Sequence, residues 1–293
     1  MKSWFAKFRK TPDAEMVEPV ETVETIMAPV EEVKAPEMDA ETYRLKLFEE
    51  VYAQDARLKD AHALIRAAIE AEPDAHDRAH LRTHEIRYLQ TIALLPHGPG
   101  DLVDIGALSY YGEALKTIKK WRLHNVDILS IDYERDPLPF EDASFDAALL
   151  GEVIEHFIID PLFCLIEINR ILKPGGAFVV TTPNAASWFS IYEALNQRHP
   201  SRWPVYSSDP AKARNHIHAR EYTCGELRLL LEAAGFGEFQ QVTLDYAIAP
   251  PFKPIAGFDP GNRGETIFLG CRKTSGPRAR YIAPIYLETE TLP

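Results

Sequence analysis

The most informative pattern lies at residues 138–184, which read LPFEDASFDAALLGEVIEHFIIDPLFCLIEINRILKPGGAFVVTTPN. The apolar runs at 147–150 and 177–182 are typical of strands buried inside a parallel sheet. Between them, residues 158–172 repeat apolar side chains at helical spacing, and the Lys-Pro-Gly-Gly at 173–176 should end that helix. A strand, a crossover helix and a second strand form one half of a doubly wound sheet, and such sheets bind ligands at the carboxyl ends of their strands.

Residues on both sides of this block extend the same α/β pattern. Residues 102–107 and 126–131 are predicted to be strands, joined by a helix at 111–122. Further along, Thr223 and Glu226 have the spacing of a capping box, which predicts the start of a helix. The remaining predicted elements are a helix at 186–195 and two closing strands at 238–246 and 265–271, paired at the sheet edge.

The composition excludes several classes of protein. The chain has 293 residues, 46% of them apolar, and no apolar run approaches the roughly 20 residues that cross a membrane. Its three cysteines lie far apart, so disulfides and a structural zinc site are not expected and a reducing cytoplasm is predicted. The net charge of −12 divides into +4 for residues 1–10, −8 for residues 11–40 and −8 for the rest. Without a basic stripe, nucleic acid is disfavoured as a partner.

The chain is predicted to divide into four parts. Residues 1–40 are interpreted as a disordered acidic tail, rich in Pro, Glu, Val and Ala. Its first ten residues are basic and aromatic, which favours either a weak contact with a membrane surface or partner, or simply a frayed terminus. Residues 41–95 are expected to form a helical cover, residues 96–275 the main domain and residues 276–293 a C-terminal tail.

A glycine-containing turn, Asp104-Ile105-Gly106, follows the first predicted strand. Together with the 138–184 block, it resembles class I S-adenosylmethionine-dependent methyltransferases with a Rossmann-like fold. The run HAREYT at 218–223 also resembles bacterial methyltransferases of sugar and polysaccharide biosynthesis. The resemblance implies a three-layer αβα sandwich with a mostly parallel sheet, an antiparallel edge strand and an N-terminal helical cover. It further implies S-adenosylmethionine as cofactor and O-methylation of a small-molecule or glycan acceptor, such as a sugar or glycolipid precursor.

The resemblance places cofactor binding at the ends of the predicted strands. A glycine at 106 lets the backbone approach the cofactor, so Gly106→Val is expected to block binding without unfolding the domain. The family uses one acid after its second strand for the ribose and one after its third for the adenine, and Asp132 aligns with the later position. Only 28 positions separate Asp104 from Asp132, so the ribose acid is unidentified unless Asp132 takes that role. The implied cofactor-binding residues are Asp104, Gly106, Ala107, Asp132, Tyr133, Glu134 and Glu152.

Two groups of polar residues are candidates for catalysis. Glu152 and His156 follow the 147–150 strand, where the family has its methyl-transfer centre, and a histidine can deprotonate an acceptor hydroxyl. The alternative is that Glu152 and Glu155 begin a helix and His156 is structural.

The second group lies just before the capping box. Arg220 and Tyr222 suit an acceptor with several hydroxyls or a phosphate, and His218 can take a proton from it. The alternative is that Arg220 pairs with Glu221 to hold this loop closed. His216 and His218 have no neighbouring ligands at convincing spacing, so no metal is predicted.

Two other functions stay open. The shortened first half and its missing ribose acid are compatible with a degenerate, non-catalytic relative that acts as a binding or scaffold protein. An enzyme that methylates another small molecule, such as an amine or a lipid head group, has the same sequence features. The oligomeric state is not predicted.

Overall fold

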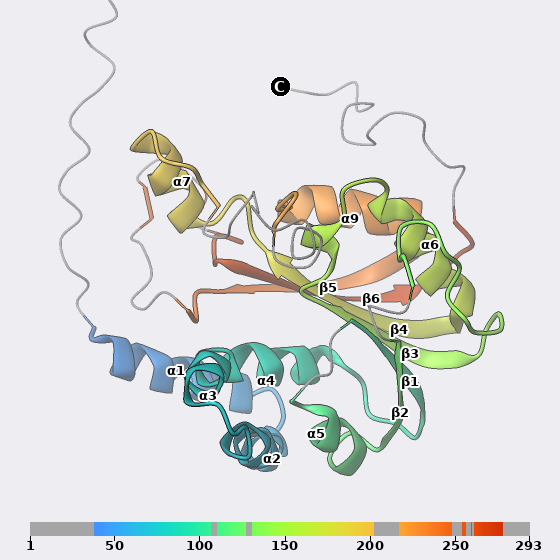
Figure 1. Cartoon of the computed structure of the whole chain (residues 1–293), viewed down its shortest axis with the longest axis horizontal. Coiled ribbons are helices and arrows are strands. Elements are labelled where there is room, and N and C mark those ends of the chain that lie inside the picture. The colour runs from blue at the N-terminus through green and yellow to red at the C-terminus, as the bar shows by residue number, and fades with distance from the viewer. Residues whose placement is uncertain are drawn as a thin grey trace, which may run out of the picture. The chain divides into compact units, whose positions relative to one another are not determined.

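A twisted sheet of six strands forms the centre of the fold (Figure 1). The computed structural model describes residues 38–106, 110–126, 131–201, 217–247, 254–255, 259 and 261–277. The strands lie in the order β2-β1-β3-β4-β6-β5; β1 to β4 pair in parallel, whereas β6 runs antiparallel to both β4 and β5. The strands are β1 (Gly100–Ile105), β2 (Trp121–Val126), β3 (Phe145–Gly151), β4 (Leu172–Pro183), β5 (Phe236–Leu244) and β6 (Thr266–Lys273).

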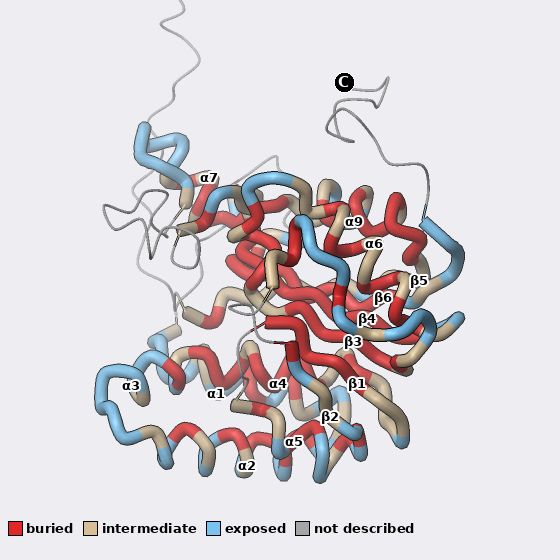
Figure 2. The backbone as a smooth tube through the Cα atoms, turned by 45° about the vertical axis from the view of Figure 1, so that its right-hand side comes forward, coloured by how far each residue is buried: buried red, intermediate tan, exposed pale blue. Residues whose placement is uncertain are grey.

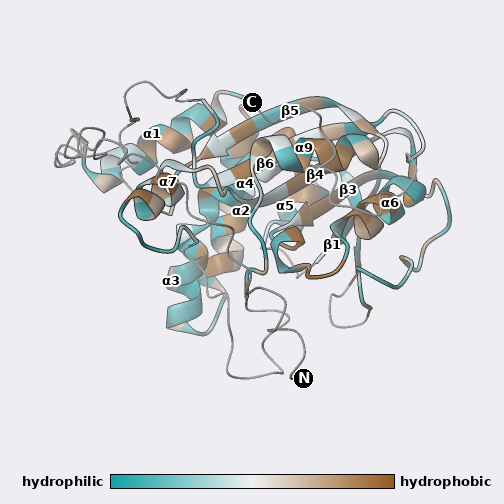
Figure 3. Cartoon of the chain, turned by 90° about the horizontal axis from the view of Figure 1, so that it is seen from above, coloured by the Kyte–Doolittle hydropathy of each residue, from teal (hydrophilic) through white to brown (hydrophobic). Residues whose placement is uncertain are grey.

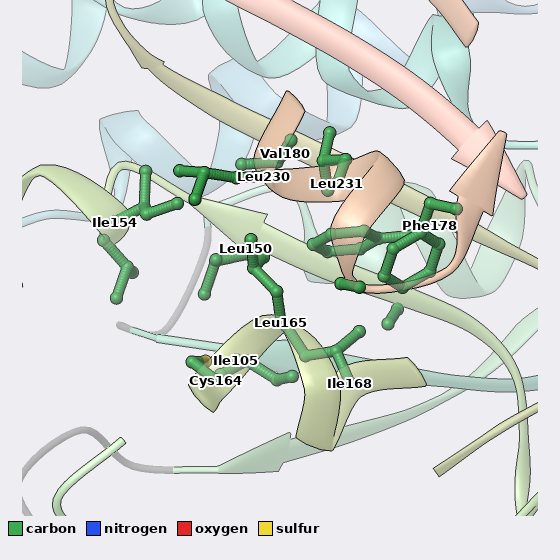
Figure 4. Close-up of a cluster of buried hydrophobic side chains, with 14 of the residues drawn as sticks. Ile105, Leu150, Ile154, Cys164, Leu165, Ile168, Phe178, Val180, Leu230 and Leu231 are labelled. Atoms are coloured by element: carbon green, nitrogen blue, oxygen red, sulfur yellow. The ribbon is translucent and has the colours of Figure 1, made fainter. Parts of the chain in front are cut away.

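Helices cover both faces of this sheet. Two helices, α6 (Pro161–Ile171) and α9 (Cys224–Ala233), pack on one face, where Leu150 and Phe178 meet Leu165 and Leu231 (Figure 4). The helices before β1 and the one after it lie on the other face (Figure 1). These are α1 (Ala40–Tyr52), α2 (Leu58–Glu70), α3 (Ala75–Thr83), α4 (Glu85–Leu94) and α5 (Gly112–Thr117).

The central strands are buried on both sides, as their apolar sequences predict. In β3, Leu149 belongs to the apolar cluster under α2, α4 and α5, whereas its neighbour Leu150 belongs to the cluster under α6 and α9. Figure 2 shows β3 and β4 buried over most of their length, and in Figure 3 they are largely hydrophobic while α3 is hydrophilic. The predicted three-layer αβα fold, with its antiparallel edge and helical cover, is therefore confirmed.

Local sequence signals set the ends of several helices. Asp160 caps α6 by accepting a hydrogen bond from the backbone N–H of Phe163, and a proline follows at the first helical position. Thr223 and Glu226 form the predicted capping box at the start of α9. The helix predicted at 186–195 is α7 (Trp188–Leu195), and a single 3₁₀ turn, η2 (Ile154–His156), links β3 to the α6 region.

One prediction about the first half of the sheet is wrong. The helix expected at 111–122 ends at Thr117, and the strand expected at 126–131 is β2, at Trp121–Val126. Lys120 lies between them with a φ of 66°, which ends the helical conformation. Trp121 and Val126 are buried because β2 pairs with β1, so a tertiary contact sets the position of this strand.

A buried carboxylate anchors the helical cover. Glu85, at the start of α4, accepts hydrogen bonds from His62 at 3.2 Å and Arg66 at 3.3 Å. Burial alone would raise the pKa of Glu85, but these two partners lower its pKa to about 2. The network ties α2 to α4, so the cover is held in place by charge as well as by apolar contacts.

Several predictions concern residues that the structure does not describe. Residues 1–37, and with them the proposed basic and aromatic contact segment, lie outside the described residues, as do residues 278–293. The limits predicted for the four parts of the chain therefore stay predictions. Within the described part of the chain, no helix is both long enough and apolar enough to span a membrane.

Candidate functional site

The carboxyl ends of β1, β3 and β4 lie side by side because these strands are parallel neighbours. The turn after β1 contains Gly106, whose φ of 143° is a conformation that other residues rarely adopt. A Cβ atom added there would lie 2.8 Å from Cγ2 of Val153, just after β3. The turn therefore requires glycine for its own packing. Asp104, which precedes it, is buried at 3% exposure.

Glu152 occupies the end of β3 in a strained conformation, with a φ of 55°. Its Oε2 lies 3.0 Å from Nη1 of Arg87, which comes from α4 in the helical cover. Its other oxygen, Oε1, is buried and has no hydrogen-bond partner among the described residues. Burial alone would lower the pKa of Arg87, but Tyr246 and Glu152 beside it raise that pKa instead. The strand end thus presents one neutralised and one unpaired carboxylate oxygen.

A pocket opens next to Glu152. It is lined by residues just before α4, just after β3 and β5, at the end of β4, in and beside α7, in the 217–222 segment and at the start of β6. Three of its lining side chains are carboxylates, namely Glu152, Glu221 and Glu265, and among the described residues no lysine or arginine lines it. The pocket is therefore suited to neutral or cationic polar molecules rather than to phosphates.

A second polar cluster lies directly after Glu152, where Glu155 and His156 in η2 meet His218 from the distant 217–222 segment. Ligand-type atoms of the three residues lie within 4.8 Å of one another. The two imidazole rings meet edge to face, with centroids 5.0 Å apart. Glu155 is fully buried, and burial together with the charge of Glu152 raises its pKa well above the usual range.

Hydrogen bonds hold this cluster together. Nδ1 of His156 lies 2.7 Å from the carbonyl oxygen of Ile217, and Nδ1 of His218 lies 3.4 Å from Oε1 of Glu221. The backbone N–H of Arg220 donates to the carbonyl oxygen of Glu155 at 3.2 Å. Segments more than 60 positions apart in the sequence are thereby joined at one place, so both predicted histidines belong to the same site.

The other two residues predicted in the 217–222 segment have different surroundings. Arg220 donates to Oε1 of Glu226 at 2.7 Å, so it braces the capping box of α9. Tyr222 is 2% exposed within the apolar cluster under α6 and α9, and this burial raises its pKa. Both side chains contribute to the position of the loop, and Tyr222 in particular is not open to an acceptor.

The acids predicted for adenosine binding are used within their own loop. Glu134 accepts hydrogen bonds from three successive backbone N–H groups, those of residues 158–160, at 2.5–3.1 Å. Tyr133 is buried and donates to the carbonyl oxygen of Val126 at 2.8 Å, while Asp132 accepts from the backbone of Glu134 at 3.1 Å. These contacts fix the loop between β2 and β3. Ala107 and His216 lie outside the described residues.

One residue of the polar cluster was not predicted for the site. Glu155 was interpreted only as a possible helix start, although Glu152, Glu155 and His156 fall within a single turn of chain. Asp127 follows β2 directly in the sequence but lies outside the described residues.

Comparisons with known proteins decide the class of the central domain. Residues 102–180 match the family described as "Methyltransferase domain". The chain contains a methyltransferase domain. This match agrees with the predicted class of enzyme, and the predicted cofactor, S-adenosylmethionine, appears in the name of one relative of that segment. The predicted sugar or glycan acceptor is not shown by these matches.

Relatives of the methyltransferase domain have several different names. A probable S-adenosylmethionine-dependent methyltransferase of Mycolicibacterium smegmatis is 34% identical over 126 residues, which are 43% of this chain and 41% of that protein. A dimethylglycine N-methyltransferase of Parasynechococcus marenigrum is 32% identical over 116 residues, 31% of this chain and 40% of that protein. The chain thus spans about two fifths of the length of these curated relatives.

A solved methyltransferase from Thermotoga maritima, described as a possible histamine N-methyltransferase, is 21% identical with a TM-score of 0.42. The similarity covers 78% of this chain and 99% of that one.

Proposed function

We propose that the chain is an S-adenosylmethionine-dependent methyltransferase that methylates a hydroxyl group of a small polar acceptor. The observation that carries the proposal is the position of Glu152. It lies at the carboxyl end of β3, next to the Gly106 turn on one side and to the acidic pocket on the other, with Oε1 buried and unpaired among the described residues. A group in this position can bind a donor from either the cofactor or the acceptor.

The residues at the strand ends are suited to the cofactor. S-adenosylmethionine supplies a methyl group on a sulfonium centre, and it carries a positively charged ammonium group as well. Asp104 and Glu152 provide negative charge, while the glycine turn keeps side chains away from the strand end. Asp127 is the proposed partner of the ribose hydroxyls, since it follows β2 directly. Asp132 and Glu134 are left with the loop contacts described above.

Deprotonation of the acceptor belongs to the cluster that contains His156 and His218. When the acceptor oxygen forms its bond to the methyl carbon, the carbon–sulfur electron pair leaves with sulfur and the hydroxyl proton must be removed. An imidazole within hydrogen-bond reach of the hydroxyl is suited to that transfer. A sugar or a glycan precursor is the acceptor we propose, because its neutral hydroxyls fit a pocket lined by carboxylates and without lysine or arginine among the described residues.

An amine acceptor is the second candidate. The three carboxylates of the pocket favour a cationic molecule, and one relative is named a dimethylglycine N-methyltransferase. The two candidates separate in an assay that measures consumption of the methyl donor against matched panels of sugars and amines. Turnover with amines alone would remove the hydroxyl acceptor from the proposal.

Titration calorimetry with S-adenosylmethionine and S-adenosylhomocysteine tests the enzyme directly. Glu152→Gln keeps the shape of the side chain and should weaken binding of one or both ligands by roughly tenfold or more, since a charge-assisted hydrogen bond is worth about 1.5–3 kcal/mol. Glu49→Gln, on the exposed side of α1, is the matched control and should bind as the unmodified chain does. If the unmodified chain releases no heat with millimolar ligand, the proposed methyltransferase function is excluded, and a binding or scaffold function is proposed in its place.

We also propose the coarser organisation that the sequence predicts. It comprises the helical cover at 41–95, the methyltransferase domain at 96–275 and tails at either end, in a cytoplasmic protein. Limited proteolysis tests these limits, and it should remove residues 1–40 first because their composition does not support a packed core.

A further inference from the structure

The cluster of Glu155, His156 and His218 has the composition of a metal centre. Two imidazoles and a carboxylate form a common set of protein ligands for divalent transition-metal ions. Their ligand-type atoms lie within 4.8 Å of one another. Atoms bound to one zinc ion at about 2.1 Å are separated by roughly 3.5 Å. Shifts of about an ångström would therefore bring all three onto one ion.

Glu155 supplies independent support for a cation here. The side chain is fully buried, and Oε2 accepts a hydrogen bond from the Thr182 hydroxyl at 3.0 Å. Oε1 is also buried and has no hydrogen-bond partner among the described residues. A buried carboxylate oxygen without a partner is costly, and a cation beside it would offset that cost. No lysine or arginine in the described structure forms an ion pair with Glu155.

The imidazoles are oriented as metal ligands usually are. The carbonyl oxygen of Ile217 can only accept, so Nδ1 of His156 carries a proton, and in the neutral ring the lone pair is on Nε2. His218 has the same arrangement, with Glu221 as the carboxylate that faces Nδ1. Metal-bound histidines typically donate their second ring N–H to a carbonyl or carboxylate in this way.

We infer that Glu155, His156 and His218 bind one divalent transition-metal ion, such as Zn²⁺, beside the methyl-transfer site. Two imidazoles favour Zn²⁺, Co²⁺ or Fe²⁺ over Mg²⁺ and Ca²⁺, which prefer oxygen ligands. Three protein ligands leave coordination positions for an acceptor oxygen, whose pKa the ion would lower. This catalytic role rests on the proposed function, and the ion would then replace direct deprotonation of the acceptor by an imidazole. Binding of the ion to the three residues does not depend on the proposed function.

Cobalt binding tests the site without any measurement of activity. The full chain is freed of metal with a chelator and titrated with Co²⁺, whose visible absorption reports imidazole and carboxylate ligands. One equivalent should produce the absorption, and Zn²⁺ should then abolish it. The inference would be overturned if the folded chain gave no visible absorption with Co²⁺ and released no heat when titrated with Zn²⁺.

Asparagine variants separate metal binding from folding. In His156→Asn and His218→Asn, the amide nitrogen takes the place of Nδ1 and keeps the hydrogen bond, whereas Nε2 is lost. Each variant should lose more than about 100-fold in metal affinity, since even outer partners of a ligand contribute 10–100-fold. The control His76→Asn, on exposed α3, should bind normally. Unchanged affinity in a folded double variant, His156→Asn with His218→Asn, would refute the site.

Two measurements cover the remaining outcomes. If the asparagine variants do not fold, X-ray absorption spectroscopy of the zinc-loaded unmodified chain tests the site instead. Two imidazole ligands are expected in the spectrum, and a spectrum without imidazole ligands would refute the site. If the chain binds the metal but gives no heat with S-adenosylmethionine, the proposed methyltransferase function fails while the metal site stands. If removal of the metal abolishes methyl transfer but not cofactor binding, both hold.

Discussion

Replacement of Gly106 by alanine should destabilise the methyltransferase domain although it adds only one methyl group. The φ of 143° is strained for any residue with a side chain, at a cost on the order of 1–3 kcal/mol. The new Cβ would also lie 2.8 Å from Cγ2 of Val153, and overpacking of this kind costs about 1–3 kcal/mol. We therefore expect a loss of roughly 2–5 kcal/mol in the free energy of unfolding.

Urea denaturation of four variants separates the two causes. Val153→Ala removes the methyl group that Gly106→Ala would meet, so the double variant should be more stable than the sum of the single changes by about 1 kcal/mol or more. Gly175→Ala is the control for backbone strain, because Gly175 has a φ of 75° with no atom within 4 Å of the added Cβ. This account of the turn would be refuted if the changes in the free energy of unfolding of the two single variants added up to that of the double variant. It would also be refuted if Gly106→Ala and Gly175→Ala lowered that free energy equally.

The same geometry corrects the expectation attached to Gly106→Val. From the sequence, that substitution was expected to fill cofactor space and leave the fold intact. In the structure, the added side chain meets Val153 within the domain itself, so a loss of cofactor binding would not distinguish a blocked site from an unfolded one. Glu152→Gln is the sharper probe, because it changes the charge at a strand end and leaves the backbone unchanged.

Three further measurements test other parts of the fold. Because its neighbours lower the folded pKa of Glu85, the network around it should contribute about 3 kcal/mol to stability above pH 4.5 and lose this contribution as the pH falls towards 2. The urea midpoint of the unmodified chain should therefore fall between pH 6 and pH 2.5, and that of Glu85→Gln should lack this fall. An equal fall in both proteins would contradict the prediction. A chain that begins at Pro36 should have the melting temperature of the full chain. A chain that begins at Glu41 loses the two hydrogen bonds that Asp39 accepts from Thr42, so its melting temperature should be about 2–4 °C lower. A large drop in melting temperature for the chain that begins at Pro36 would show that the tail packs on the domain. Thr223→Ala should cost about 1 kcal/mol through the capping box while Thr223→Ser costs much less, and equal urea midpoints for the two would argue against the cap.

The parts of the fold that were predictable have local signals. Strands β3 and β4 contain the apolar runs at 147–150 and 177–180, and α9 begins at the capping box of Thr223 and Glu226 that the sequence displays. Each signal acts within a few residues of its element, so the sequence alone suffices to place it.

The strand β2 had no such signal. Its sequence WRLHNV mixes polar and apolar residues, and only Trp121 and Val126 are buried. All six of its residues pair with β1, so a tertiary contact places this segment in the sheet. The consequence reaches the proposed function, because Asp127 follows this strand in the sequence, whereas the sequence prediction left the ribose acid unidentified unless Asp132 took that role.

The polar cluster was predictable only in part, for a similar reason. Both histidines could be chosen from the sequence as chemically capable groups, but nothing local indicates that His218 would meet Glu155. Their contact depends on the hydrogen bonds between the 217–222 segment and η2, which exist only once the sheet has formed. Residue type thus identified candidates, and tertiary structure decided which of them act together.

The charge balance of the site connects the helical cover to the chemistry. The charge of Glu152 helps to raise the pKa of Glu155, and Arg87 forms an ion pair with Glu152 at this strand end. Arg87 belongs to α4, so the cover supplies a charge that the sheet lacks. A cation beside Glu155 would favour its ionised form, and the two proposed ligands of the site, a sulfonium cofactor and a divalent metal ion, are both cations. The carboxylates of Glu152, Glu221 and Glu265 that line the described pocket thus complement the positive charge of both proposed ligands.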